Sequence, residues 1–365
     1  MQITTSSRVC SLAAVALGLL ATASCSKAPE SAPTATTPAA QAGPACNRKC
    51  LVDATDAYVA ALVAHDVAKA PLSDDIAFVE NVTKMKPGEG LWKSIVKGPG
   101  TFAIHVPDEV EQSAGYLAMV TYMGPAQAPQ GSSPAQREAF AKKNPPSEQP
   151  AIIAIRLKFD PKGRIVQAEH LLSGVREPQM ANLQSPRPGI FTEIPAEQRR
   201  SHDDLVKIGL SYYDALDDNN GELAPFAPDC ERHENGMITA SDKPSTAPTV
   251  PGAAAQPKVA RDCRQQLSTN TFQYIDKIEN RRVFAADPQT GLVMGLSHFR
   301  HPMTNLPYKV KALDGSMVER NKKNMPFAPF DLPAAHIFKV GADGQIHEIE
   351  AMGFTAPLNS ATGWE

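Results

Sequence analysis

Residues 58–81 of this 365-residue chain recur, without a gap, as residues 212–235. The similarity returns at a larger offset of 181 near the end of each copy, so the second copy holds 27 more residues than the first. The matching pairs are Tyr58/Tyr212, Ala61/Ala215, Leu62/Leu216, Ala70-Pro71/Ala224-Pro225, Asp75/Asp229 and Glu80-Asn81/Glu234-Asn235, then Lys158/Lys339, Gly163/Gly344, Ile165/Ile346 and Glu169/Glu350. This period far exceeds the roughly 20–50 residues of solenoid repeats, so the pattern predicts duplication of a whole domain. We expect domains at residues 46–180 and 199–365, joined by a linker at 181–198.

Each copy has the same expected order of elements. Residues 47–65 and 202–216 have apolar side chains at helical spacing. Extended, alternating segments follow, and a Pro161-Lys162-Gly163 turn in the first copy corresponds to Asp343-Gly344 in the second. The expected strands are residues 115–123, 149–159 and 165–173, then 292–299, 334–340 and 345–353. Helices followed by a curved antiparallel sheet predict the α+β class for each of the two copies.

The first 25 residues have the pattern of an export signal, with Arg8 before a short apolar run. Residues 21–25, Ala-Thr-Ala-Ser-Cys, resemble a bacterial lipobox, which would leave Cys25 as a lipidated N-terminus, although Thr22 stands where Leu is usual. The alternative is ordinary cleavage before Ser24. Residues 26–45, rich in Ala, Pro and Thr, are typical of an extended tether. We therefore expect either a lipid-anchored protein on the periplasmic face of a bacterial membrane or a secreted one.

Charge and cysteine usage narrow the class further. The chain has 36 Lys and Arg against 39 Asp and Glu, which gives no electrostatic footprint for nucleic acid. No later apolar run predicts a spanning helix, so membrane contact is expected through the lipid alone. The four cysteines after the leader allow three pairings, of which Cys230–Cys263 with Cys46–Cys50 is favoured. A metal site is the rival interpretation, but the Cys46/Cys50 spacing has no second close Cys or His pair.

The repeated segments carry a family resemblance. The motifs are Asp56-Ala57-Tyr58, Ala70-Pro71, Glu80-Asn81 and Gly88-Glu89-Gly90-Leu91-Trp92, then residues 224–230, Glu234-Asn235-Gly236 and Arg281-Arg282-Val283. With them the chain resembles the nuclear transport factor 2-like superfamily, which includes SnoaL-like polyketide cyclases, and an exported group with two such domains. The resemblance implies two cone-shaped sheets, each wrapped around an apolar pocket capped by helices. Members include isomerases, dehydratases, lyases and plain binding modules, so the fold does not decide the function.

The second copy has histidines where the first is apolar or aromatic. His298 aligns with Tyr122, His336 with Ile155 and His233 with Val79. Strand alternation groups His336 with Phe338, and His298 with Leu296, on faces expected to point inward. Histidines there are suited to proton transfer. The plainer interpretation of each one is a core residue bonded to a backbone carbonyl.

These residues predict a small-molecule pocket in the second copy. His298 and His336 are the acid/base candidates, and Tyr212 is placed to orient a substrate oxygen. His233 and the carboxylates Glu234 and Glu350 are assigned to binding. Tyr58 and Tyr122 are the corresponding candidates in the first copy. The Glu80-Asn81 pair is assigned to the scaffold, because a strand-end Asn often closes a turn through its own side chain.

Several chemistries have no support in the sequence. It has no G-x-S-x-G elbow, no Gly-rich phosphate loop and no H-E-x-x-H helix. The expected function is a cofactor-independent isomerase, lyase or dehydratase acting on a small apolar organic molecule. The alternative is a non-catalytic envelope protein that binds such a ligand, and a third possibility is a module whose pockets are filled by side chains.

Overall fold

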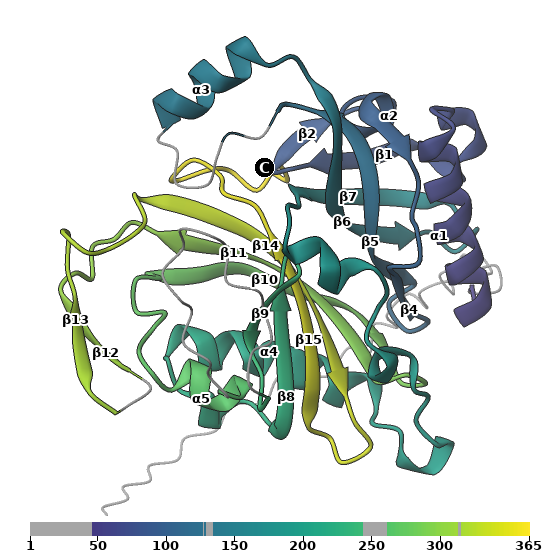
Figure 1. Ribbon diagram of the computed structural model, residues 1–365. Helices are drawn as coiled ribbons and strands as arrows, with labels where there is room; N and C mark the ends of the chain where they lie inside the picture. Colours follow the sequence, from purple (N-terminus) through teal and green to yellow (C-terminus); the bar gives the residue numbers. More distant parts are fainter. Residues whose placement is uncertain (1–45, 127, 129–133, 244–260, 313–314) are drawn as a thin grey trace, which may run out of the picture. The chain divides into compact units, whose positions relative to one another are not determined.

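The computed structural model describes residues 46–126, 128, 134–243, 261–312 and 315–365 (Figure 1). The expected leader, Cys25 and tether lie outside these residues. All described residues belong to one compact unit. The protein is α+β, with two mixed sheets and few helices. None of the helices in the described ranges combines the length and apolar character needed to cross a membrane.

The first half, residues 46–180, builds the first sheet in the strand order β2-β1-β7-β6-β5-β3, with β4 paired to β5. Its main helix begins after Asn47, whose side chain accepts a hydrogen bond from the backbone N–H of Cys50. The elements are α1 (Arg48–Val63), the 3-10 turn η1 (Val67–Lys69), β1 (Leu72–Glu80), β2 (Thr83–Met85), α2 (Leu91–Ser94), β3 (Ile95–Lys97), β4 (Ala103–Asp108), β5 (Ser113–Gly124), α3 (Pro134–Lys143), β6 (Ser147–Phe159) and β7 (Ile165–Gly174).

The second half, residues 199–365, builds the second sheet in the order β10-β11-β14-β15-β8-β9, and β12 and β13 form a separate hairpin. Ser201 caps its main helix by accepting from the N–H of Asp204. The elements are α4 (His202–Asp217), the 3-10 turn η5 (Gly221–Leu223), β8 (Phe226–Glu234), β9 (Met237–Ala240), α5 (Cys263–Leu267), β10 (Lys277–Asp287), β11 (Leu292–His301), β12 (Tyr308–Lys311), β13 (Met317–Arg320), β14 (Phe330–Val340) and β15 (Ile346–Gly353). The connection between the halves contains the 3-10 turns η2 (Gln179–Leu183), η3 (Pro188–Phe191) and η4 (Ala196–Gln198).

The sheets differ from the antiparallel expectation in one respect. β1 pairs with β7 in parallel, and β8 pairs with β15 in parallel. The first strand after each helix lies beside the last strand of the same half, and both strands run in the same direction. The remaining pairs are antiparallel, which makes each sheet mixed.

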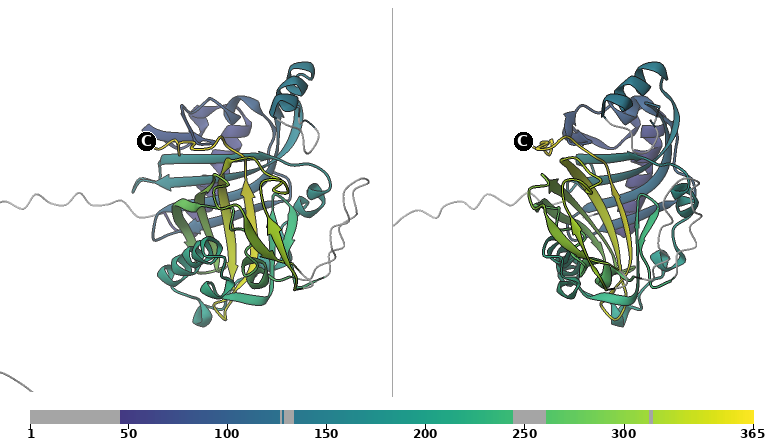
Figure 2. Two further views of the ribbon diagram at one scale, coloured as in Figure 1. Left: turned by 90° about the vertical axis from the view of Figure 1, so that its left-hand side faces the viewer. Right: turned by 60° about the vertical axis from the view of Figure 1, so that its left-hand side comes forward.

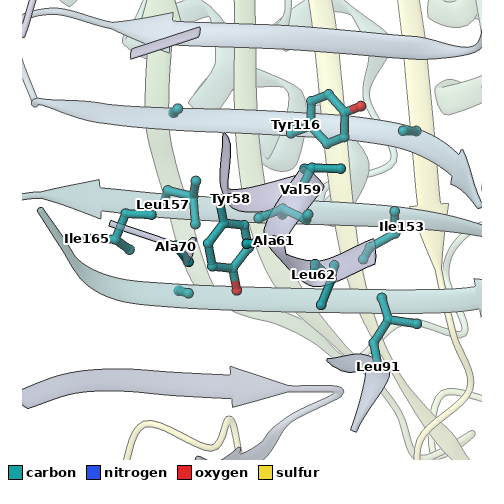
Figure 3. Close-up of a cluster of buried hydrophobic side chains, with 14 of the residues drawn as sticks. Tyr58, Val59, Ala61, Leu62, Ala70, Leu91, Tyr116, Ile153, Leu157 and Ile165 are labelled. Carbon is teal, nitrogen blue, oxygen red and sulfur yellow. The ribbon is translucent and has the colours of Figure 1, made fainter. Parts of the chain in front are cut away.

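Each sheet has an inner face, covered by its own helix. In the first half, α1 places Leu51, Tyr58 and Leu62 against side chains of β5, β6 and β7, and Figure 3 shows part of this cluster. α4 does the same in the second half with Leu205, Tyr212 and other buried residues. Both helices therefore use the apolar spacing that the sequence predicts.

The outer faces of the two sheets pack against each other (Figure 2). Ile104, Leu117 and Ile152 of the first sheet share one buried cluster with Met294 and Ile337 of the second. A fully buried aliphatic side chain contributes about 1.5–3 kcal/mol, so this cluster holds the halves together. The strands at this contact are consequently buried on both faces.

The favoured disulfide pairing is confirmed: Cys46 bonds to Cys50, and Cys230 bonds to Cys263. The second bond joins β8 to α5 across 33 residues, most of them outside the described ranges, and backbone hydrogen bonds between Ser241 and Arg261 close the base of that segment. Two disulfides are typical of a protein that folds in an oxidising compartment outside the cytoplasm.

Candidate functional site

The two histidines expected to share a pocket lie on opposite faces of the second sheet. His336 belongs to the inner face, where its ring centroid is 5.1 Å from that of Tyr212. His298 lies on the outer face, on the same side of β11 as Met294 and Leu296, which pack against the first sheet. The expectation that His298 points inward is therefore wrong. Both faces of β11 are buried, so apolar neighbours do not distinguish its inner face from its outer face.

A small cavity of about 40 Å³ lies on the inner face of the second half. We call it the inner cavity. It is lined by Leu216 of α4, Arg232 and Glu234 of β8, Phe272, Tyr274 and Ile275, Phe299 and His301 of β11, Leu332, Ala334 and His336 of β14, and Ala351, Met352 and Gly353 of β15. Three predicted residues contribute to this region: His336 and Glu234 line it, and Tyr212 lies just behind them.

Arg232 organises the polar wall of the inner cavity, although the sequence pattern does not single it out as a site residue. Its three guanidinium nitrogens donate to Tyr212 (3.0 Å), to the Thr239 hydroxyl (2.7 Å) and to Glu234 (2.7 Å). Glu234 therefore pairs with an arginine and not with an imidazole. The one available sequence signal was Arg232 lying two residues before Glu234, which puts both on one strand face.

His336 is fully buried among aromatic rings, with its Nδ1 3.3 Å from the hydroxyl of Tyr213. Burial, and secondarily the charge of Arg232, holds the pKa of His336 well below its ordinary value. The imidazole is consequently neutral at physiological pH.

His301 is a second imidazole on the inner cavity, and it was not among the expected site residues. It is the last residue of β11, and its ring stacks on Phe330 with centroids 4.2 Å apart. Its Nδ1 is buried without a hydrogen-bond partner. Burial lowers the pKa of His301 to about 4, despite the opposing charges of Asp331 and Glu234.

His298 belongs to a separate polar cluster on the outer face. Its Nε2 is 3.0 Å from the Ser360 hydroxyl and 3.2 Å from a nitrogen of Arg300. Arg300 also binds the buried carboxylate of Asp331, which accepts from the backbone N–H of Ser360 at 2.8 Å. This cluster attaches the C-terminal segment to the second sheet, so His298 has a structural environment far from the inner cavity.

His233 and Glu350 also face outward. The Nε2 of His233 is 2.8 Å from Glu231, and its Nδ1 is 3.8 Å from Glu350. Arg187 of the connection binds Glu350 at 3.0 Å and donates to the backbone carbonyls of Glu231 and Ile349. These residues join the connection to the second sheet and have no contact with the inner cavity.

The first half contains a buried chain of polar groups at the corresponding place. The hydroxyl of Tyr58 is 2.9 Å from Nε2 of His170, and Nδ1 of that ring is 3.2 Å from Glu80. Glu80 also accepts from the backbone N–H of Leu91. All three side chains are buried, and the edge of Trp92 packs on Tyr58. Tyr122, the other candidate of this half, is only partly buried beside the first core.

Asn81 and Asn235 have the scaffold role that the sequence predicts. Each exchanges two hydrogen bonds with one backbone residue on the last strand of its sheet, Leu172 for the first and Gly353 for the second. Both residues have positive φ, of 45° and 47°, which asparagine tolerates better than most residues.

Arg281 and Arg282, which belong to the motifs of the family resemblance, both form internal ion pairs. Arg281 binds Asp214 and Asp217 of α4, and Arg282 binds the buried Glu169 of the first half through two nitrogens, at 2.6 and 2.9 Å. The carboxylate that Arg282 binds through two nitrogens therefore belongs to the protein itself, and not to a ligand. Within the described ranges, no group of three or more His, Cys, Asp or Glu side chains is arranged to hold a metal ion.

Comparison with known proteins adds one finding. A family model described as a domain of unknown function (DUF8021) matches residues 198–353. No curated protein matches the chain. The matched range begins just before α4 and ends with β15, so it covers the second half through its last sheet strand, including the side chains of the inner cavity.

Proposed function

We propose that this chain is an exported protein with two nuclear transport factor 2-like domains, and that its second half binds a small, uncharged organic molecule at the inner cavity. The observation that carries the binding proposal is the convergence of two neutral imidazoles, His301 and His336, on the same cavity as Glu234.

The domain proposal rests on matching architecture. The order β2-β1-β7-β6-β5 in the first sheet corresponds to β9-β8-β15-β14-β11 in the second. A long helix and a 3-10 turn precede the first strand of each half. The side chains of Asp66 and Asn220 cap the two turns in the same way. Tandem duplication of one helix-covered sheet accounts for all of these matches together.

The export proposal rests on the two disulfides and on the pattern of the first 25 residues. We propose lipidation at Cys25, with cleavage before Ser24 as the alternative. Mass spectrometry of the mature N-terminus separates the two. A lipoprotein begins at Cys25 and carries additional acyl mass, whereas the alternative product begins at Ser24 and carries none.

The chemistry of the inner cavity favours a neutral ligand. A neutral imidazole offers both a donor and an acceptor, which suits a hydroxyl, carbonyl or amide. Glu234 and Arg232 neutralise each other, and all three guanidinium nitrogens of Arg232 already donate to protein acceptors, so this pair leaves no free cation for an anionic ligand. A volume of about 40 Å³ is well below the roughly 300–1,000 Å³ of ordinary ligand pockets. The inner cavity therefore admits one polar end of a ligand, while the ligand body lies against the surrounding aromatic rings.

Proton transfer is the second candidate function, because titratable groups converge on the inner cavity as an isomerase or lyase requires. The depressed pKa of each imidazole argues against it, since a general base works best with a pKa near the working pH. Binding is therefore the function that the geometry supports better.

The binding proposal is tested by NMR titration of the imidazole Cε1–H resonances with phenol and cyclohexanone as neutral probes and benzoate as the anionic one. We expect a neutral probe to shift the His301 and His336 resonances, and His336→Phe to weaken its binding about tenfold, the scale of one lost buried hydrogen bond. The matched control is His347→Phe, at a partly exposed histidine that does not line the inner cavity. Unmoved resonances with both neutral probes, or equal weakening in the control, contradict the proposal.

The same cyclohexanone sample in deuterium oxide tests the second candidate. An active base removes a proton from the carbon beside the carbonyl, and solvent returns a deuteron there. Exchange above the buffer rate that is lost in His336→Phe identifies catalysis, whereas exchange at the buffer rate leaves binding as the function.

A further inference from the structure

A larger cleft lies where the two halves meet, beside the edge strand β10 of the second sheet and the first two turns of α4. Its volume of about 480 Å³ falls in the range of ordinary ligand pockets. We call it the interhalf cleft. It is lined by Glu111, Ser113, Arg156 and Lys158 of the first half and by His202, Asp203, Val206, Lys207, Arg282, Val283 and Phe284 of the second.

The polar lining of the interhalf cleft is predominantly basic, with four Lys and Arg side chains against two carboxylates. Both carboxylates have neighbours inside the lining: Glu111 is 3.3 Å from Lys158, and Asp203 is 3.2 Å from His202. Lys207 has only a distant contact, 4.0 Å to Asp204, and most of its side chain is exposed. Lys207 is therefore the lining cation with the loosest internal ion pair, and its charge is accessible to a ligand.

Two arginines form the floor of the charged region. Arg156 donates to Gln167 at 2.8 Å, and Arg282 binds Glu169. Each nevertheless has a buried Nε without a hydrogen-bond partner. An unmet buried donor is unusual in a folded protein, and here two occur on side chains that line one cleft.

His202 adds a titratable group to the basic lining of the interhalf cleft. Burial lowers its pKa, but hydrogen bonds to Asp203 and Asp108 outweigh burial and raise the pKa above its ordinary value. Its Nε2 is 2.9 Å from Asp108, whose same oxygen accepts from the backbone N–H of Ala286 at 2.9 Å. His202 therefore lies on the contact between the halves.

Apolar side chains complete the interhalf cleft. Val206 of α4 and Val283 and Phe284 of β10 supply them. The guanidinium of Arg156 lies 5.7 Å from the ring centroid of Phe284 and 5.7 Å from that of Trp364, within the range of cation–π attraction. The C-terminal segment returns to the first sheet (Figure 1). The indole N–H of Trp364 donates to Glu169 at 3.0 Å.

We infer that the interhalf cleft binds an amphipathic organic anion, with its acidic group near Lys158 and Lys207 and its hydrocarbon body on Val206, Val283 and Phe284. The ligand class is a carboxylate or sulfonate joined to an aromatic or aliphatic body. This site is independent of the inner cavity, because the two share no lining residue. The two ligands also differ in charge, since the molecule proposed for the inner cavity is neutral.

Two fluorescent probes with one skeleton test this inference on the full mature chain. The first is 8-anilinonaphthalene-1-sulfonate, and the second is N-phenyl-1-naphthylamine, which lacks the sulfonate. We expect the sulfonate to bind with one-to-one stoichiometry, about tenfold or more tighter than the neutral probe, and to weaken as salt is added. Absence of sulfonate binding, or equal affinity for both probes, overturns the inference.

Variants locate the binding. Lys158→Gln with Lys207→Gln removes two partly exposed charges and leaves the core intact, so the fold is preserved. We expect it to weaken the sulfonate about tenfold and the neutral probe little, whereas Asp203→Asn strengthens sulfonate binding. The matched control, Lys322→Gln with Lys323→Gln, removes the same charge from an exposed turn of the second half. Equal weakening in the control contradicts this location.

His336→Phe separates this result from the proposed function. It alters the inner cavity alone, so sulfonate affinity stays unchanged if the two sites are distinct. A parallel loss of sulfonate binding in His336→Phe shows that the probe occupies the inner cavity and rejects the interhalf site.

Discussion

The two halves place a tyrosine and a glutamate at equivalent positions and connect them differently. In the first half His170 lies between Tyr58 and Glu80, and in the second Arg232 lies between Tyr212 and Glu234. The connecting residue of the first half, His170, belongs to β7, the last strand of that half in chain order. The connecting residue of the second half, Arg232, belongs to β8, the first strand of its half. The register shows the exchange, because Glu80 faces His170 across the pair of strands, whereas Glu234 faces Ala351.

This exchange explains why the interiors differ. Phe78 of the first half corresponds to Arg232 of the second, and His170 corresponds to Ala351. In the first half the rings of Phe78 and His170 pack edge to face, with centroids 4.9 Å apart. In the second half Ala351 stands in place of the His170 ring, and Arg232 donates to its hydrogen-bond acceptors. The inner cavity is lined by both Arg232 and Ala351. A change of partner in one hydrogen-bond chain thus accompanies the inner cavity of the second half.

Arg232→Phe is the most severe way to break this comparison. It gives β8 the residue of the first half without the matching histidine, so Tyr212 and Glu234 lose their shared donor. Removing one partner of a buried charged pair costs about 3–5 kcal/mol of unfolding free energy, and we expect this from urea unfolding. Arg164→Phe, at a half-exposed arginine paired with Asp160, costs under about 1 kcal/mol. Similar losses in both variants contradict the assigned role of Arg232.

The pH dependence of stability follows from His301 and His336. Their pKa values in the folded protein lie below the unfolded value, so the unfolded chain binds more protons once the pH falls below about 6.5. Stability therefore decreases as the pH falls from about 6.5 toward 4. We expect a loss of about 3 kcal/mol between pH 6.5 and 5 in urea unfolding, from the two residues together.

Two variants with opposite expected effects on the acid loss of stability check this prediction. His301→Phe with His336→Phe makes the acid loss shallower. His347 is the control: burial lowers its pKa, but hydrogen bonds to Asp343 and Asp229 outweigh burial and raise it. Its contribution is present below the unfolded pKa and is lost as the pH rises, so His347→Gln makes the acid loss steeper. The same direction of change in both variants contradicts the assignment.

Ala351→His, added to Arg232→Phe, sharpens the comparison with the smallest expected effect. It gives the second half the ring pair of the first, with an imidazole between Tyr212 and Glu234. We expect recovery of about 1–2 kcal/mol relative to Arg232→Phe, the usual size of coupling between contacting residues. Ala351→His alone crowds Arg232 and destabilises, so a double-mutant cycle measures the coupling. Additive effects contradict the equivalence of the two hydrogen-bond chains.

The regular elements were largely predictable because local pattern decides them. Residues 149–159 and 334–340 were expected as strands and lie in β6 and β14. The parallel pairs β1/β7 and β8/β15 were not predicted, since no local signal states which distant strand lies beside another. β4 and β10 were also missed, and both have one face against the other half.

The site was predictable only in part, and β11 shows why. His298 and His301 both follow the apolar run of this strand, and alternation separates them onto opposite faces. Alternation does not state which face is inner. His301 and Arg232 line the inner cavity, whereas the expected His298 and Glu350 bind partners on the outer face.

The amino-acid sequence by itself determined the repeat, the two leading helices, the main strands and the cysteine pairing, because each depends on spacing along the chain. Tertiary structure decided which histidines share a cavity, which carboxylates pair with Arg187, Arg232 and Arg282, and where the interhalf cleft lies. The physical reason is that the second sheet is buried on both sides, so the hydrophobic pattern of its strands carries no information about which side faces α4 and which faces the first half.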